Sequence, residues 1–468
     1  MLRSLPLLLL TLLLTLPLAN RAATPHPPDL VLFIADDYTW HDLPAYGSTD
    51  VRTPNLDQLT QQSLRFRLAY AASPTCSPSR SAIYTGLYPM RNGAHANHSL
   101  IKEGVLTLPI YMQRLGYRVV IAGKTHIGPR DQFPFEYLPN SNIMPPGKHE
   151  LLYTDLNTDA VDNLLKTNDR SKPLCLLVCS HSPHVYWMDN EGFDPAKITL
   201  PPYLVDTPET RSMRCQYYTD VAHMDQQVGQ VRASLAKYNY SPIFMFTADQ
   251  GAQWPFAKWE LYDAGIRVPL LVQWPGHIKG YTSTDALVSL IDILPTFISL
   301  AGGTPPPDLD GQSFLNVLTA SSNHHRDEIF AAHTGDKEMN VAPMRCIRTG
   351  PWKYILNLTP QIPYRTHING GGPRDGRIYW DSWVKLAQHD PHAASVVQRY
   401  THKPAEELYN LDTDPYELTN LAPLPQYKQT VDDLREKVRL WRIQQGEDPA
   451  AKPLMPTDGR TGELKYAG

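Results

Sequence analysis

The chain has 468 residues, of which 42% are hydrophobic and 19% are charged, and its formal net charge is −4. This length allows two or three domains, and the apolar content excludes a chain that is disordered throughout. The 43 basic and 47 acidic residues nearly balance, which excludes a general attraction to nucleic acid or to an anionic membrane. An anionic substrate would therefore need a local cluster of positive charges.

The N-terminal segment predicts a secretory signal peptide over residues 1–23. A basic start precedes an apolar run over residues 5–18, and small residues follow it. Pro6 and Pro17 bracket this run, which is shorter than the roughly 20 residues of a membrane-spanning helix, so a membrane anchor is the weaker interpretation. We expect export to a periplasm, the extracellular medium or, in a eukaryote, a lysosome, with no membrane contact after the signal is removed.

Four short apolar runs that end at polar residues predict buried parallel strands. Such runs suit strands covered on both faces, so we expect an α/β fold with a large, mostly parallel sheet between helices. The carboxyl ends of parallel strands meet at one edge of the sheet, where ligands bind. An Asp at the end of a single strand often only caps the helix that follows, but polar residues at the ends of four strands favour a binding site. The runs are 30–35 before Asp36 and Asp37, 117–122 before Lys124 and His126, 174–179 before His181 and His184, and 243–248 before Asp249 and Gln250.

From about residue 336 the pattern changes to that of a smaller α+β domain. Residues 344–356 predict antiparallel strands, and an apolar stripe further on predicts a closing helix. We therefore expect a catalytic domain over residues 24–335 and a smaller domain over residues 336–468. The stripe consists of Val431, Leu434, Val438 and Trp441.

The five cysteines are too few for a disulfide scaffold, and their odd number leaves at least one unpaired or chemically special in an exported protein. Cys76 stands out because it opens the segment Cys76-Ser77-Pro78-Ser79-Arg80, which Thr85-Gly86 extends. This segment resembles the Cys-x-Pro-x-Arg signature of the type I sulfatases. In that family the cysteine is oxidised during export to formylglycine, an aldehyde carried as its hydrate. The alternative is a buried free cysteine beside a turn.

The resemblance covers nearly the whole chain after the signal peptide, and it implies an alkaline-phosphatase-like fold and a formylglycine-generating enzyme as maturation partner. It also implies a metal site. Asp36 and Asp37 match the first metal pair of the family, and Asp249 and Gln250 occupy the place of the second, where Asn or His is more usual than Gln. Three carboxylates and an amide oxygen suit Ca²⁺ first and Mg²⁺ second. The modified Cys76 completes the expected ligand set.

The resemblance also implies catalytic roles. The hydrate of residue 76 would attack sulfur, and Arg80, Lys124 and Lys258 would supply fixed positive charge for the developing oxyanions. His184, with Lys258, would protonate the leaving group. His126 would then take a proton from the second hydroxyl and release sulfate. Imidazoles suit both proton transfers because their ordinary pKa is near neutral.

Within the family the chain is most similar to heparan N-sulfatase (sulfamidase) members, which implies a sulfated carbohydrate substrate such as a fragment of heparan sulfate or another glycosaminoglycan. Lys258 lies where those members carry arginine, and a lysine there is usual in O-sulfatases, so O-sulfate hydrolysis stays open. We expect a homodimer, with substrate contacts from His181, Lys258, Arg345 and His367. Further loop candidates for sugar contact are His98, Tyr364, Arg365 and Arg374.

Two other classes of function remain. One is a phosphoryl-transfer hydrolase of the same fold, which would use Ser or Thr as nucleophile and need more histidine ligands. The other is an inactive glycan-binding relative, which would require that Cys76 is never converted.

Overall fold

The computed structural model describes residues 27–144, 154–336 and 339–456, so the expected signal peptide lies outside the described residues. Its main feature is an eight-stranded sheet in the order β11-β2-β10-β9-β1-β8-β4-β5. All neighbours are parallel except β10, which is antiparallel to both β9 and β2. The strands are β1 (Leu30–Ala35), β2 (Leu64–Phe66), β4 (Arg118–Gly123), β5 (Glu136–Tyr137), β8 (Leu174–Cys179), β9 (Ile243–Ala248), β10 (Leu270–Gln273) and β11 (Thr282–Thr284).

The central strands β1, β8 and β9 are buried along their whole length, as their uninterrupted apolar sequences predict. Their register aligns their carboxyl ends: Ala35 pairs with Ala248, and Ile34 pairs with Cys179. The residues that follow these strands therefore emerge side by side at one edge of the sheet.

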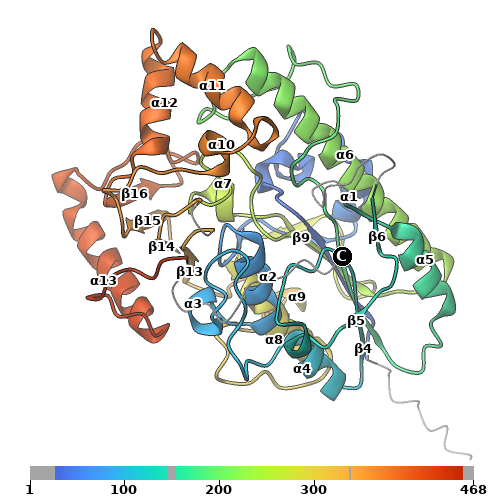
Figure 1. Ribbon diagram of the computed structural model, residues 1–468. Helices are drawn as coiled ribbons and strands as arrows, with labels where there is room; N and C mark the ends of the chain where they lie inside the picture. The colour runs from blue at the N-terminus through green and yellow to red at the C-terminus, as the bar shows by residue number, and fades with distance from the viewer. Residues whose placement is uncertain (1–26, 145–153, 337–338, 457–468) are drawn as a thin grey trace, which may run out of the picture.

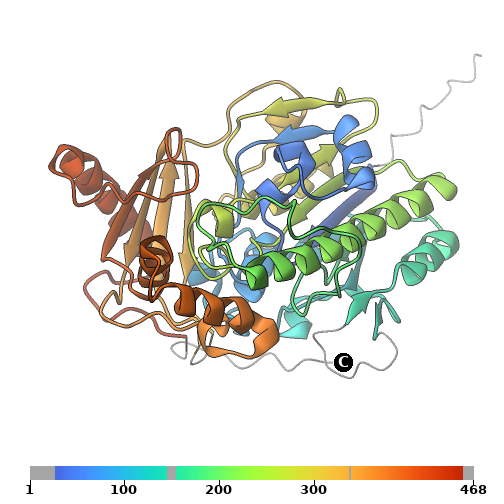
Figure 2. The same cartoon turned by 90° about the horizontal axis from the view of Figure 1, so that it is seen from above.

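Two groups of helices cover the sheet, one on each side (Figures 1 and 2). On one side, α1 (Pro54–Gln61) and α5 (Thr158–Thr167) pack against the long helix α6 (Pro208–Lys237). On the other side, α2 (Cys76–Thr85), α4 (Leu108–Arg114) and α8 (Ile293–Leu300) pack together. The predicted α/β class is confirmed. None of the described helices is both long and apolar enough to cross a membrane.

A second, antiparallel sheet lies beside the first and consists of β13 (Glu328–His333), β14 (Met344–Thr349), β15 (Trp352–Asn357) and β16 (Glu406–Asn410). The closing helix α13 (Lys428–Gln444) packs on it through Val431, Leu434 and Val438, as its apolar stripe predicts. Helices α11 (Arg377–Leu386) and α12 (Pro391–Thr401) lie between β15 and β16 in the chain. Strand β13 precedes residue 336, so the small sheet begins before the expected boundary, and the division into two domains stays a prediction.

A buried ion pair joins the small sheet to a short helix that follows β9 in the chain. The amino group of Lys353, on β15, lies 2.7 Å from Asp263 in the short helix α7 (Asp263–Ile266) and donates to the carbonyl of Leu261. All five cysteines are buried and free of disulfide bonds, which agrees with the prediction that they form no disulfide scaffold.

Candidate active site

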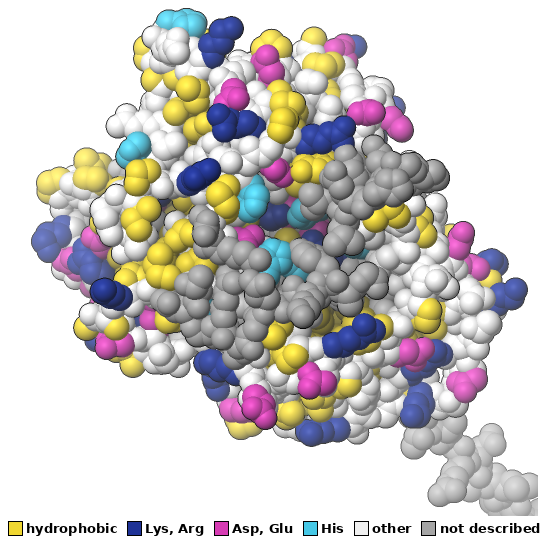
Figure 3. Space-filling model, viewed as in Figure 1, with side chains coloured by type: hydrophobic (Ala, Val, Ile, Leu, Met, Phe, Trp, Pro, Cys, Tyr) yellow, Lys and Arg dark blue, Asp and Glu magenta, His cyan; other side chains and the backbone are white. Residues whose placement is uncertain are grey.

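The polar residues that follow β1, β4, β8 and β9 meet the N-terminus of α2 at the bottom of a pocket of about 500 Å³. Figure 3 shows histidine and acidic side chains gathered around the hollow in this face of the molecule. Asp36, Cys76, Lys124, His184 and Lys258 all line the pocket. The structure thus brings together the residues that the strand ends predicted.

A glycine shapes the end of β4 at this edge. Gly123 has φ +81°, and a Cβ atom there would lie 2.0 Å from the carbonyl oxygen of Cys179 on β8. Only glycine fits this close approach and this left-handed backbone. Gly123 therefore lets the chain turn out of the sheet so that Lys124 and His126 point into the pocket.

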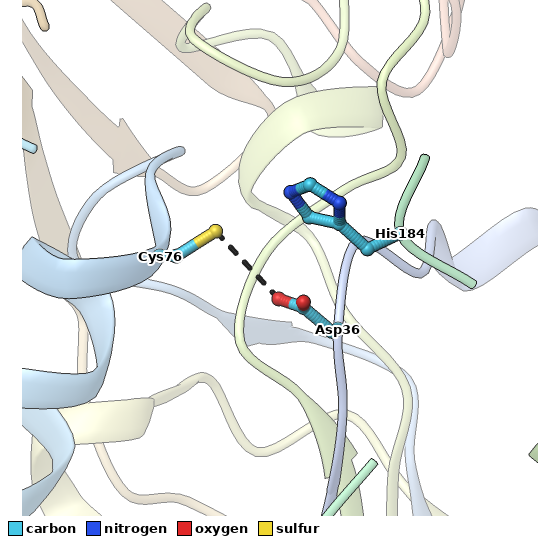
Figure 4. Close-up of side chains that lie close together, drawn as sticks. All are labelled: Asp36, Cys76 and His184. Carbon is cyan, nitrogen blue, oxygen red and sulfur yellow. Dashed lines mark hydrogen bonds between the residues drawn. The ribbon is translucent and has the colours of Figure 1, made fainter. Parts of the chain in front are cut away.

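Cys76 is the first residue of α2 and is 2% exposed. Its Sγ atom lies 3.6 Å from Oδ1 of Asp36 and 3.8 Å from Oδ1 of Asp37, and Figure 4 shows it pointing toward Asp36 with His184 nearby. Burial raises the pKa of the Cys76 thiol, and the nearby Lys124 and Lys258 only partly offset this. The unmodified side chain is thus a neutral thiol and a weak nucleophile.

Asp36, Asp37 and Asp249 offer carboxylate oxygens that lie within 4.8 Å of one another, and all three side chains are fully buried. The Gln250 amide closes the cluster: its Nε2 lies 2.6 Å from Oδ1 of Asp37 and 3.0 Å from the sulfur of Cys76. Its Oε1 is buried without a hydrogen-bond partner, an arrangement that costs free energy unless another ligand uses that oxygen. Three carboxylates and a spare amide oxygen fit a hard divalent cation, and Gln250 can serve as its ligand.

Three cations balance these carboxylates: Arg80 and Lys258 are buried, and Lys124 is partly buried. Arg80 donates from Nε to Asp249 at 2.9 Å and from Nη2 to Asp36 at 3.3 Å. Lys124 forms an ion pair with Asp36, and Lys258 donates to Asp37 at 2.5 Å. The cluster therefore holds positive charge in fixed positions around the sulfur of Cys76, where an anionic substrate group would lie.

The pKa values in the cluster diverge because the charges are packed tightly. Burial opposes ionisation of Asp36, but Lys124 and His184 outweigh it and hold the pKa of Asp36 well below its usual value. Burial and the two neighbouring aspartates raise the pKa of Asp249 to about 8, against the opposing effect of Arg80. A bound divalent cation would add a nearby positive charge, which lowers this pKa and favours the ionised carboxylate.

Three predicted histidines surround the cluster. Nε2 of His184 lies 3.6 Å from Asp37, Nε2 of His181 lies 2.7 Å from Oδ1 of Asn142, and Nε2 of His126 lies 2.8 Å from Nδ1 of His98. Burial, aided by the neighbouring lysines, lowers the pKa of His184 to about 4 and of His181 to about 3, and places the pKa of His126 well below its usual value. All three imidazoles are neutral near pH 7 before a substrate binds.

Not every predicted substrate contact reaches the pocket. Arg345 is fully buried and pairs with Glu447 through Nε and Nη2 at 2.9 and 2.8 Å, so the prediction that it contacts sugar is corrected to a structural role. Tyr364 is buried too, and its hydroxyl donates to the carbonyl of Trp259. Arg365 and Arg374 are outside the pocket lining, whereas His98 and His367 belong to it.

The sequence missed several residues of the pocket wall, because they lie on loops with no periodic pattern. Loop residues far apart in the chain meet here: Asn97 Nδ2 donates to Asp336 at 3.1 Å across 239 positions. The ring of Trp259 stacks on that of His367 at a centroid distance of 5.5 Å. The residues missed are Asn97, Asn142, Gln253, Trp259, Asp336 and Asp375.

Two family models match the chain. The model described as "Sulfatase" matches residues 28–303, more than half of the chain, and the model described as "N-sulphoglucosamine sulphohydrolase, C-terminal" matches residues 251–361. The first match spans the four strand ends and the Cys76 segment, and the second begins just after Gln250.

Individual relatives agree with these matches. An "Ulvan-active sulfatase" of Formosa agariphila is 28% identical over 459 residues, covering 95% of this chain and 86% of that protein. "N-sulphoglucosamine sulphohydrolase" of Homo sapiens is 27% identical over 467 residues, covering 89% of this chain and 90% of that protein. A solved phosphonate monoester hydrolase of Agrobacterium radiobacter superposes with a TM-score of 0.66 at 20% identity over 89% of this chain and 96% of that one, a likeness of fold.

Proposed function

Because this chain belongs to the sulfatase family and is a sulfuric ester hydrolase, we propose that it removes sulfate from a sulfated carbohydrate. The observation that carries the proposal is the position of Cys76. Its sulfur lies at the N-terminus of α2, 3.6 and 3.8 Å from two side chains of the carboxylate cluster, and the cations of Lys124 and Lys258 lie close enough to lower its pKa.

We propose further that Cys76 is converted to formylglycine and that Asp36, Asp37, Asp249 and Gln250 hold Ca²⁺, or Mg²⁺ in its place. When formed, the hydrated aldehyde supplies a hydroxyl that attacks sulfur, and the cation neutralises sulfate oxygens. The raised pKa of the thiol supports this assignment, since an unmodified Cys76 has little thiolate with which to attack. We propose export as well, since the conversion takes place during export in this family.

The chain's own residues bind and orient the sulfate group. Arg80, Lys124 and Lys258 meet its oxygens at the helix N-terminus, where backbone N–H groups also favour an anion. Lys258 keeps its proton, because Asp37 raises its pKa against the effect of burial, and it can pass that proton toward the leaving oxygen or nitrogen. A bound sulfate anion raises the pKa of the neighbouring His184, so this imidazole can share that role. His126 takes the proton whose removal releases sulfate.

For the substrate, the comparisons support a sulfated glycan and leave two choices. The C-terminal match and the human relative favour an N-sulfated glucosamine, while Lys258 and the ulvan-active relative favour an O-sulfate. We propose N-sulfoglucosamine as the first substrate to test and an O-sulfated polysaccharide as the second. A homodimer remains our expectation for the assembly.

The test is a release assay on matched substrates with protein coexpressed with a formylglycine-generating enzyme. N-sulfoglucosamine, an O-sulfated oligosaccharide, an aryl sulfate and the corresponding aryl phosphate are compared, with Cys76→Ala as control. We expect sulfate release that Cys76→Ala abolishes. A preference for the phosphate ester would instead establish a phosphoryl-transfer hydrolase, and glycan binding without turnover would establish the inactive relative.

A further inference from the structure

We propose that His98 and Asp336 form a positioning pair for His126, which orients this imidazole and stabilises it after it takes up a proton. The inference rests on the proposed function, because it gives His126 the proton that is removed as sulfate leaves. It changes the role expected for His98 from sugar contact to support of a neighbouring side chain.

Three side chains from three loops lie in a row, His126, His98 and Asp336. Nδ1 of His98 lies 2.8 Å from Nε2 of His126, and the two rings are tilted by 50° at a centroid distance of 4.6 Å. On its other side, Nε2 of His98 lies 3.5 Å from Oδ2 of Asp336. All three residues line the pocket that contains Cys76.

Asn97 links this row of side chains to the helix turn that carries Cys76. Its Oδ1 accepts from the backbone N–H of Ser77, the residue after Cys76, at 3.3 Å. Its Nδ2 lies 3.1 Å from Oδ2 of Asp336 and 3.1 Å from Nε2 of His98. One side chain therefore fixes the position of the pair relative to the first turn of α2.

The backbone gives independent support. His98 has φ +61° and His126 has φ +48°, values that a residue with a side chain seldom adopts, and Asp37 in the carboxylate cluster has φ +64°. Such conformations cost free energy and persist where the surroundings require them, often at functional sites. His98 thus shares this feature with two residues of the active centre.

The proton transfer to His126 explains what His98 and Asp336 do. As sulfate leaves residue 76, the remaining hydroxyl loses its proton to His126, its oxygen becomes the aldehyde oxygen, and the bond from carbon to the sulfate oxygen breaks. His126 is then doubly protonated, so its Nε2–H must donate, and Nδ1 of His98 must accept. This places the His98 proton on Nε2, toward Asp336, an acceptor whose pKa of about 2, set by His98 and Asn97 against burial, keeps it ionised. Because Nε2 of His98 is a donor in this state, the Asn97 amide group does not bond to it and donates instead to the Asp336 carboxylate.

Kinetics of His98→Ala test the assignment. With an aryl sulfate whose alcohol leaves easily, we expect kcat to fall about 10- to 100-fold, as for loss of comparable supporting partners, while KM changes by less than about 3-fold. Because sulfate release becomes slow, one equivalent of alcohol per formylglycine-bearing chain should appear in a burst. His98→Gln, which keeps a donor and an acceptor, should recover most of the kcat, and His389→Ala, on an exposed loop, serves as control.

Three results would overturn the inference while the proposed function stands: a His98→Ala enzyme with wild-type kcat, a rise in KM alone, which would mean substrate contact, or a loss that His98→Gln does not recover. An inactive wild-type enzyme bearing formylglycine would instead refute the proposed function.

A second readout does not depend on activity. In Cys76→Ala protein with ¹⁵N-labelled histidine, the short N–H···N hydrogen bond should give a scalar coupling between Nε2 of His126 and Nδ1 of His98. The coupling should vanish in the His98→Gln background and weaken with Asp336→Asn. Its absence from the Cys76→Ala protein would show that the pair does not form.

Discussion

Replacement of Asp220 by Asn should stabilise the protein, by an amount that grows with pH. Asp220 lies on α6, is 4% exposed, and accepts a hydrogen bond at 3.1 Å from the backbone N–H of Met188, in the loop that carries His184. Burial raises its pKa to about 8, and the nearby His223 offsets this only in part. An asparagine keeps the acceptor oxygen and has no charge to bury.

The sign follows from proton linkage. The folded Asp220 holds a proton between its unfolded pKa of about 4 and its folded pKa of about 8, whereas the unfolded chain does not. The stability that depends on protonated Asp220 in the folded wild type is therefore complete below about pH 4. It is lost as the pH rises to 8, at about 1.4 kcal/mol of unfolding free energy per pH unit. Asp220→Asn removes this loss, so its gain should be about 1.5 kcal/mol at pH 5 and at most about 4 kcal/mol at pH 7.

Denaturant unfolding of wild type and Asp220→Asn at pH 5, 6 and 7 measures this difference. Asp412→Asn, at an exposed site, controls for loss of one negative charge. A variant that is less stable than wild type, or a gain that does not change with pH, would refute the reasoning. Sulfatase activity should be kept, because the anchor of the His184 loop is preserved.

Three further predictions concern the site. Lys258→Gln should lower kcat/KM about 10²- to 10³-fold in steady-state assays, since it removes one fixed charge and the ion pair with Asp37, and an undiminished rate would contradict its role. Chelation should abolish activity and Ca²⁺ should restore it, and Gln250→Ala should need about 10-fold more Ca²⁺ in the same titration; equal requirements would exclude Gln250 as a ligand. Gly123→Ala should cost about 2 kcal/mol or more in denaturant unfolding, because its Cβ would meet Cys179, and a neutral effect would contradict the close approach.

Local sequence was enough to predict the parts of the molecule that depend on local patterns. The apolar runs predicted β1, β8 and β9 and the polar residues that follow them, because strands buried on both faces leave polar side chains only at their ends. The segment at Cys76 was recognisable because its spacing is short and strict.

The pocket wall could not be predicted in the same way. Arg345 and His98 are single polar residues among others, and only tertiary structure decides that Arg345 turns to Glu447, 102 positions away, while His98 turns to His126. Asp336 contacts Asn97 across 239 positions of the chain. Contacts of this kind depend on how loops from separate strands pack, which no periodicity encodes.

The state of residue 76 in protein purified from its native source is the most direct test. Mass spectrometry of the peptide that contains residues 76–80 should show the mass of an aldehyde or its hydrate in place of the thiol. The fraction of chains with this mass should match the fraction that is active. Fully active protein in which every such peptide still carries the cysteine thiol would contradict the account.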